Sequence, residues 1–211
     1  MSKLRRIVLL RHGETVGQSS LRFHGSNDVE LSDEGRHHVR EAARLLRTEV
    51  FDLAVTSPLR RAWEAAHIVT GGAALRIEAD FREIDFGRWE GLTMEEIEAT
   101  DPALHREWME RLESFEFPAG ESRSGFDERV QSGLERLRGS GASSALVVSH
   151  KGPICSIAKH LLGHPLEEHE PPLAGIVSLY RGNDGSWLQG RRGSDPVGLT
   201  ASSFLSGLTA R

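Results

Sequence analysis

Reactive side chains follow directly after short apolar runs, and this repeated pattern is the feature that most constrains the fold. Ile7–Leu10 is a continuous β-branched and leucine run that stops at Arg11 and His12, which is typical of a strand buried on both faces. Similar runs lie at 53–56 and 145–148, and 75–78 is predicted to be a short third strand. Helical patterns separate these runs, and strands that alternate with helices predict an α/β fold with a mostly parallel sheet.

Helical spacing and capping residues locate the remaining elements. Apolar residues recur at helical spacing over 32–47, 59–70, 126–137 and 153–162, and two short helices are predicted to begin at Thr93 and at Asp101, the first as a capping-box pair with Glu96. The charged segment Asp80–Gly91 has no clear period and is expected to be a loop. Asn183, Asp184 and Gly185 separate two strand-like runs at 176–180 and 186–189, which predicts an antiparallel hairpin at the sheet edge.

We therefore expect a three-layer α/β/α sandwich with a mostly parallel central sheet and an antiparallel edge strand. A small helical insertion, roughly residues 81–121, is expected over the functional site. A length of 211 residues fits one domain over 1–211. The pattern assigns no helix or strand after Arg191.

Composition excludes several classes of function. A formal charge of −5 argues against a protein that binds nucleic acid through charge. The single cysteine, Cys155, cannot form an internal disulfide, and Met1–Leu10 has too few apolar residues for a signal peptide or a membrane span. We expect a cytoplasmic protein without a membrane partner. A homodimer is compatible with the sequence, which leaves the oligomeric state open.

The reactive residues are selective when they are mapped onto the predicted strands. Arg11 and His12 follow the first strand, Arg61 the second, Glu83 the third after a few residues, and His150 the fourth. Open α/β sheets bind ligands at the carboxyl edge of their strands, where these side chains would meet. Two arginines beside two histidines form a cationic pocket that suits a phosphate dianion.

This set of residues predicts phosphoryl transfer. An imidazole kept neutral by neighbouring arginines retains a lone pair for attack on phosphorus, so His12 is the candidate nucleophile. A carboxyl group can protonate the departing alkoxide. Glu83 is the candidate, although Asp85 and Glu90 are close enough in sequence to face the same pocket. Arg60 is expected at the surface, beside the functional Arg61.

Four sequence blocks together resemble the histidine phosphatase superfamily, which includes the cofactor-dependent phosphoglycerate mutases. The blocks are Leu10-Arg11-His12-Gly13-Glu14-Thr15, Ser57-Pro58-Leu59-Arg60-Arg61-Ala62, Glu83 to Gly91, and Ser149-His150-Lys151-Gly152. A weaker block contains Gly120-Glu121-Ser122 and Arg129. The resemblance implies that His12 is phosphorylated, that Arg11, Arg61 and His150 complete the phosphate pocket, and that Glu83 donates the proton. It also implies that no metal and no other cofactor is needed.

Gln18 stands where the family often has asparagine, and Arg22-Phe23-His24-Gly25 stands where R-x-Q-G is common. Those positions often touch the transferred group in the family. Gln18, Arg22 and His24 are therefore candidate substrate-binding residues, since each can still donate a hydrogen bond.

The resemblance favours a phosphomonoesterase that acts on small phosphorylated metabolites. The D-F-G-x-W-E-G block is closer to the broad-specificity and α-ribazole phosphatases than to the mutases. Three alternatives remain: a dedicated α-ribazole phosphate phosphatase, a phosphoglycerate mutase, and a non-catalytic module that binds a phosphorylated ligand.

Two other groups of residues invite a functional interpretation that we reject or rank second. The histidines at 37, 38, 160, 164 and 169 match no zinc-site spacing and are expected on solvated faces. The aromatic residues Trp89, Trp108, Phe115 and Phe117 can line a cavity under a lid formed by 114–120, but core packing is favoured.

Overall fold

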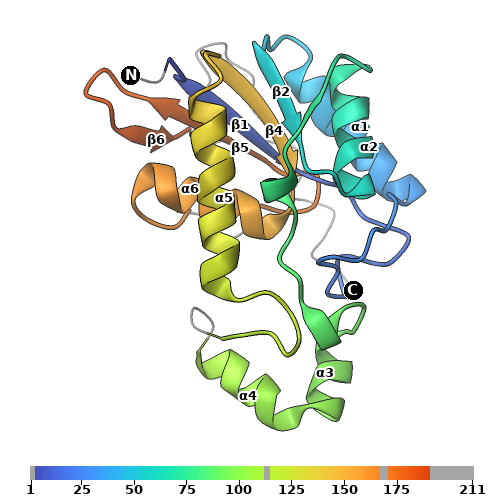
Figure 1. Cartoon of the computed structure of the whole chain (residues 1–211). Coiled ribbons are helices and arrows are strands. Elements are labelled where there is room, and N and C mark those ends of the chain that lie inside the picture. The colour runs from blue at the N-terminus through green and yellow to red at the C-terminus, as the bar shows by residue number, and fades with distance from the viewer. Residues whose placement is uncertain (1–2, 112–114, 167–170, 191–211) are drawn as a thin grey trace.

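The computed structural model describes residues 3–111, 115–166 and 171–190. Figure 1 shows a twisted sheet with helices on both faces and a smaller helical part beneath it. The strands are β1 (Arg6–Arg11), β2 (Leu53–Thr56), β3 (Arg76–Ile77), β4 (Ser144–Ser149), β5 (Ile176–Arg181) and β6 (Trp187–Gln189). The helices are α1 (Asp33–Leu46), α2 (Arg60–Thr70), α3 (Met94–Thr100), α4 (Pro102–Glu110), α5 (Arg123–Arg138) and α6 (Lys151–Leu162).

The six strands form one sheet in the order β3-β2-β4-β1-β5-β6. Strands β3, β2, β4 and β1 are parallel to one another, whereas β5 runs antiparallel to β1 and forms a hairpin with β6. The predicted mostly parallel sheet with an antiparallel edge is confirmed. In the central pair, Arg11 lies opposite Ser149, so His12 and His150 leave the sheet side by side.

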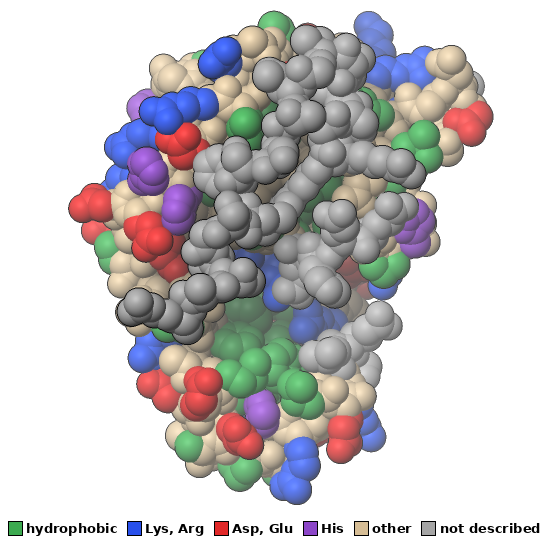
Figure 2. All heavy atoms as spheres, turned by 180° about the vertical axis from the view of Figure 1, so that it is seen from behind, with side chains coloured by type: hydrophobic (Ala, Val, Ile, Leu, Met, Phe, Trp, Pro, Cys, Tyr) green, Lys and Arg blue, Asp and Glu red, His purple; other side chains and the backbone are tan. Residues whose placement is uncertain are grey.

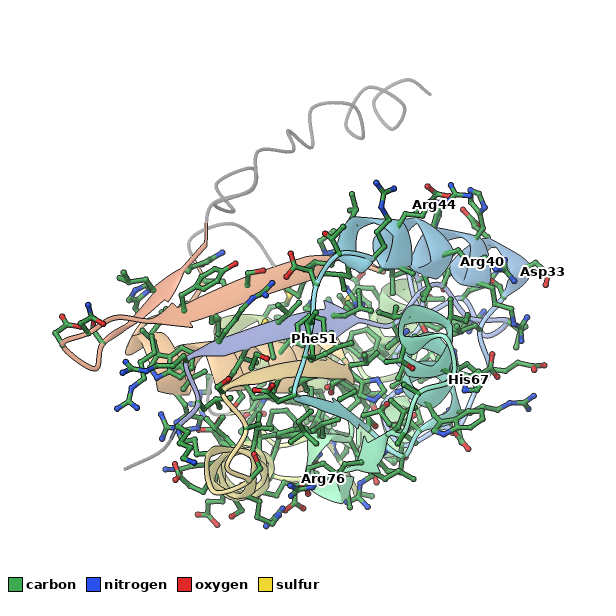
Figure 3. The ribbon with its side chains drawn as sticks, turned by 90° about the horizontal axis from the view of Figure 1, so that it is seen from above. Asp33, Arg40, Arg44, Phe51, His67 and Arg76 are labelled. Atoms are coloured by element: carbon green, nitrogen blue, oxygen red, sulfur yellow. The ribbon has the colours of Figure 1, made fainter. Side chains whose placement is uncertain are left out.

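Alternate residues of β1 and β4 pack on opposite faces of the sheet, which explains why both strands are apolar throughout. Ile7 and Leu9 join the larger core, which α5 and α6 cover. Val8 and Leu10 join a second core, which α1 and α2 cover. The polar faces of these two helices point to solvent, as Arg40 and Arg44 on α1 and His67 on α2 show in Figure 3. This arrangement confirms the three-layer sandwich.

The inserted helices α3 and α4 extend from the sheet as a small lobe (Figure 1). The predicted capping box at the start of α3 is present, with Thr93 and Glu96 each bonded to the other's backbone. An aromatic cluster of Trp89, Phe115 and Phe117 anchors the lobe, and all three side chains are buried. Core packing is therefore the correct interpretation of these three residues.

The segment 80–91 is better ordered than a sequence without periodicity suggests. It contains two short 3₁₀ turns, Ala79–Phe81 and Gly87–Trp89, and its backbone is held by carboxylates, as described below. The third strand is shorter than predicted, with two residues in place of four. Within the part of the chain that the structure describes, no helix has the length and apolarity that crossing a membrane requires.

Candidate active site

His12 and His150 face each other at the carboxyl edge of the sheet, 138 positions apart in the chain. Their ring centroids are 5.1 Å apart with the planes at 62°, and the backbone N–H of His12 donates to the Ser149 carbonyl. His12 is 4% exposed and His150 is 0% exposed. The fold thus brings together the two residues that the sequence analysis placed at the centre of the site.

The hydrogen bond at His12 determines which ring nitrogen can react. Nδ1 lies 2.7 Å from the Gly13 carbonyl oxygen, and since a carbonyl only accepts, Nδ1 carries the proton. Burial, then the charges of Arg61 and Arg11, hold the pKa of His12 well below 6.5. A neutral ring protonated at Nδ1 has its lone pair on Nε2, as a nucleophile requires.

His150 has the opposite tautomer. Arg61 Nε donates to His150 Nδ1 at 3.2 Å, so Nδ1 bears the lone pair. The proton then lies on Nε2, 2.8 Å from the Ser57 hydroxyl oxygen. Burial, followed by the charges of Arg61 and His12, also keeps the pKa of this ring well below 6.5. Ser57 thus has a contact that its place after β2 did not reveal.

Arg61 lies in the first turn of α2 and is completely buried. Besides His150, its guanidinium binds the carbonyls of Asn27 at 2.7 Å, His24 at 2.8 Å and Gly25 at 2.9 Å. Among the described residues, no carboxylate lies within 4.0 Å of its guanidinium nitrogens. Burial lowers the pKa of Arg61, and Glu83 is the largest opposing charge. The site therefore contains a desolvated cation in a fixed orientation, which favours an anionic ligand.

Glu90 organises the loop that holds Arg61. Its carboxylate accepts from the backbone N–H groups of Gly25, Ser26, Asn27 and Phe86 at 2.8 to 3.2 Å. The same loop presents its carbonyls to Arg61. Glu90 is therefore committed to the backbone, and the sequence analysis missed this positioning role while naming the residue as a possible acid.

Glu83 is the carboxylate bound at the start of α6, two residues after His150. Its Oε2 accepts from Gly152 N–H at 3.2 Å, in the first turn of α6, and Oε1 accepts from its neighbour Ile84 at 3.0 Å. A Cβ on Gly152 would lie 2.3 Å from Glu83 Oε1, so only glycine permits this approach. Asp85 instead caps the Gly87 N–H.

Arg129 and Glu121, from the weaker sequence block, hold the backbone of Glu83. Arg129 Nη2 donates to the Glu83 carbonyl at 2.9 Å, and its Nη1 donates to the carbonyls of Asp80 and Arg82. Glu121 binds the other side of the guanidinium at 2.6 and 2.8 Å. This partly buried pair holds the segment before Glu83 in place.

The remaining candidates differ in their surroundings. Arg11 donates to the Pro171 carbonyl, and its charge acts on both histidines. His24 donates from Nε2 to Gly17, its Nδ1 is buried without a hydrogen-bond partner among the described residues, and its charge acts on His12. Arg22 instead binds Glu96 and the Gly91 carbonyl. Gln18 is exposed, in the left-handed region with φ 59°. Substrate contacts by the last two stay predictions.

Figure 2 shows a hollow between the sheet and the inserted lobe, in which hydrophobic side chains gather with Lys and Arg side chains at its border. The exposed Arg60 side chain pairs with Glu30 and Glu64, in agreement with the surface position expected for it. Within the described ranges, His, Cys, Asp and Glu form no group of three that could hold a metal ion. His169 lies outside those ranges.

This constellation of two neutral histidines, a buried arginine and a nearby carboxylate is the set of residues that the sequence analysis expected to meet at one edge of the sheet. The family model of the histidine phosphatase superfamily (branch 1) matches residues 7–190. The chain belongs to this superfamily.

Several named relatives are phosphatases. Glucosyl-3-phosphoglycerate phosphatase of Mycolicibacterium vanbaalenii is 32% identical over 197 residues, 89% of this chain and 84% of the relative. Phosphoserine phosphatase 1 of Hydrogenobacter thermophilus is 31% identical, over 77% and 79% of the two chains. The bifunctional protein Rv2228c of Mycobacterium tuberculosis is 39% identical over 83% of this chain, which spans 46% of that relative's length. Phosphatase activity is thereby supported without a defined substrate.

A solved structure supports the fold independently. The α-ribazole phosphatase from Shigella flexneri has a TM-score of 0.78 with 24% identity, covering 88% of this chain and 94% of that one. At this identity the likeness concerns the fold alone.

Proposed function

We propose that this protein hydrolyses small phosphate monoesters in two steps through a phosphohistidine on His12, without a metal ion. The observation that carries the proposal is the Nδ1-protonated, neutral state of His12, which leaves Nε2 as a nucleophile beside two cationic side chains. Arg11 and Arg61 supply the positive charge that holds a phosphate dianion and stabilises the transferring group.

In the first step, His12 Nε2 attacks phosphorus and the P–N bond forms as the P–O ester bond breaks. Glu83, in its protonated form, gives its proton to the leaving oxygen, so that an alcohol departs. General acid catalysis of this kind contributes about 10²- to 10⁴-fold. The position of Glu83 beside the start of α6, next to His150, supports this assignment over Asp85 and Glu90, whose oxygens bind backbone N–H groups away from the histidines.

In the second step, the Glu83 carboxylate takes a proton from water, and the hydroxide oxygen attacks the phosphohistidine. The P–N bond breaks, His12 regains its lone pair, and inorganic phosphate leaves with Glu83 protonated again. Each catalytic group returns to its starting state, so the reaction consumes only water and the phosphate ester.

The test is hydrolysis of p-nitrophenyl phosphate by the wild type and by His12→Ala. We expect the wild type to release nitrophenol and His12→Ala to lose at least about 10³-fold in kcat, since the nucleophile is gone. His67→Ala is the matched control, because His67 lies exposed on the outer face of α2 (Figure 3). It should retain wild-type turnover.

Rapid acid quenching of the wild type during turnover should also give an acid-labile phosphoenzyme, detected by mass spectrometry on a peptide that contains His12. Phosphate binding without nitrophenol release would contradict hydrolysis and indicate a binding module. Activity that appears only with a bisphosphorylated primer would indicate a mutase.

A further inference from the structure

Arg123, the first residue of α5, is a cation that the proposed reaction does not use. Its guanidinium carbon lies 5.0 Å from the centre of the Phe117 ring, on which it stacks. Its Nε is buried without a hydrogen-bond partner among the residues that the structure describes. The side chain is partly buried, and its Nε–H is removed from water without an acceptor.

Other arginines of the same helix show how different this is. Arg129 binds Glu121 and three carbonyls, and Arg136 pairs with Glu78 and Asp80. Arg123 has no carboxylate within 4.0 Å in the described ranges, and burial lowers its pKa. Leaving buried guanidinium donors unsatisfied is costly, so a ligand that satisfies them gains affinity.

A charge effect and a row of aromatic contacts connect Arg123 to the proposed catalytic groups. Glu83 is the charge that opposes the effect of burial on the pKa of Arg123, which places the two groups within electrostatic reach. Edge-to-face contacts then run from Phe117 to Phe86, with centroids 4.9 Å apart, and from Phe86 to Phe23, 5.0 Å apart. Phe23 is the chain neighbour of His24, whose charge acts on His12.

Phe23 and Phe86 are only partly buried, so this aromatic row has accessible surface. We propose, on the basis of the function proposed above, that Arg123 is a specificity residue that binds a carboxylate on the alcohol part of the substrate.

The charge balance favours a carboxylate over a second phosphate. Arg123 is one cation, and Glu83, the residue whose charge acts on it, is protonated in the proposed first step. A single carboxylate then balances the charge of Arg123, whereas a phosphate dianion leaves an excess of negative charge there. The planar guanidinium fork also matches the two oxygens of a carboxylate.

The experiment compares 3-phosphoglycerate with glycerol 3-phosphate, which has a hydroxymethyl group in place of the carboxylate. The wild type should favour 3-phosphoglycerate in kcat/KM, and Arg123→Gln should reduce this preference about 10- to 100-fold, the range of a charge-assisted contact. Arg123→Lys keeps the charge but loses the planar guanidinium fork, so its preference should lie between those of the wild type and Arg123→Gln. Arg111→Gln removes an exposed charge from the end of α4 and should retain the wild-type ratio.

Three results would overturn the inference: equal kcat/KM for both substrates in the wild type, an unchanged ratio in Arg123→Gln, or an equal loss on both substrates. If Arg123→Gln instead reduces a preference in kcat/KM for fructose 1,6-bisphosphate over fructose 6-phosphate, the ligand of Arg123 is a second phosphate and the carboxylate assignment is wrong. Should Arg123→Gln fail to fold, the ratio in Arg123→Lys decides. A wild type that also leaves p-nitrophenyl phosphate intact refutes the proposed hydrolysis itself.

Discussion

Replacing Glu90 by glutamine tests whether a residue remote from the chemistry fixes the geometry of the phosphate pocket. The Glu90 carboxylate accepts four backbone N–H donors, three of them in the loop that holds Arg61. An amide keeps one oxygen and places an NH₂ group where the second oxygen was. At least one donor then faces another donor, and the remaining bonds lose their charge assistance.

Charged hydrogen bonds contribute about 1.5–3 kcal/mol each and neutral ones about 0.5–1.5 kcal/mol. One lost bond and the weakened others, discounted because Ser26 and Asn27 are exposed and can bind water, give a loss of about 2–4 kcal/mol in the free energy of unfolding. For a chain of this size that corresponds to a Tm lower by roughly 4–16 °C.

Activity should fall as well, because the displaced loop no longer fixes the guanidinium of Arg61 through its carbonyls. Small misplacements of a catalytic group cost about 10²-fold, so we expect kcat of Glu90→Gln on p-nitrophenyl phosphate to fall by about 10- to 100-fold at a temperature where the variant is folded. Glu30→Gln is the matched control: within the described part of the chain the Glu30 carboxylate pairs with Arg36 and Arg60 alone, and exposed pairs contribute about 0–1 kcal/mol. If Glu90→Gln has the same Tm and the same kcat as Glu30→Gln, the positioning role of Glu90 is refuted.

Three further predictions concern the reacting groups. Glu83→Gln should lower kcat about 10²- to 10⁴-fold on an alkyl phosphate but much less on p-nitrophenyl phosphate, whose leaving group needs little protonation; equal losses on both would contradict the acid role. Arg61→Lys should lower kcat/KM about 10²- to 10³-fold, because lysine keeps the charge but loses the bonds to the loop and to His150; a loss below about threefold would show that charge alone suffices. The pKa values of His12 and His150 are lowered in the folded state, so the unfolded chain binds more protons below pH 6.5 and the free energy of unfolding should fall as the pH drops from about 6.5 toward the folded pKa values. Urea titrations at pH 7.5 and 5.5 check this, with the His12→Ala variant expected to lose less stability between the two.

The strands, the main helices and the histidine pair could be predicted because their signals are local. Ile7–Leu10 and Ala145–Val148 are apolar at every position since both faces of the sheet are covered, and the parallel pairing of β1 with β4 then brings His12 to His150. The capping box at Thr93 is equally local. Such signals need no knowledge of distant contacts.

The segment 80–91 could not be read in this way, because its order comes from contacts across the chain. Arg129 holds its carbonyls from α5, and Glu90 joins it to residues 25–27. The roles of Glu90 and Arg123 were missed for the same reason: each depends on a neighbour more than five residues away. Sequence spacing alone left three carboxylates as candidate acids. The family resemblance favoured Glu83, and the backbone bonds of Asp85 and Glu90 support that proposal.

The two histidines divide the chemistry because their hydrogen bonds select opposite tautomers. The Gly13 carbonyl can only accept, which leaves Nε2 of His12 free to bond to phosphorus. Arg61 Nε can only donate, which keeps Nδ1 of His150 unprotonated while Ser57 receives its Nε2 proton. A protonated His150 would lose the bond to Arg61, and a protonated His12 would lose its lone pair. Burial and the positive charge of Arg61 disfavour both protonations. In the proposed reaction, the same guanidinium that attracts a phosphate also preserves the nucleophile that attacks it.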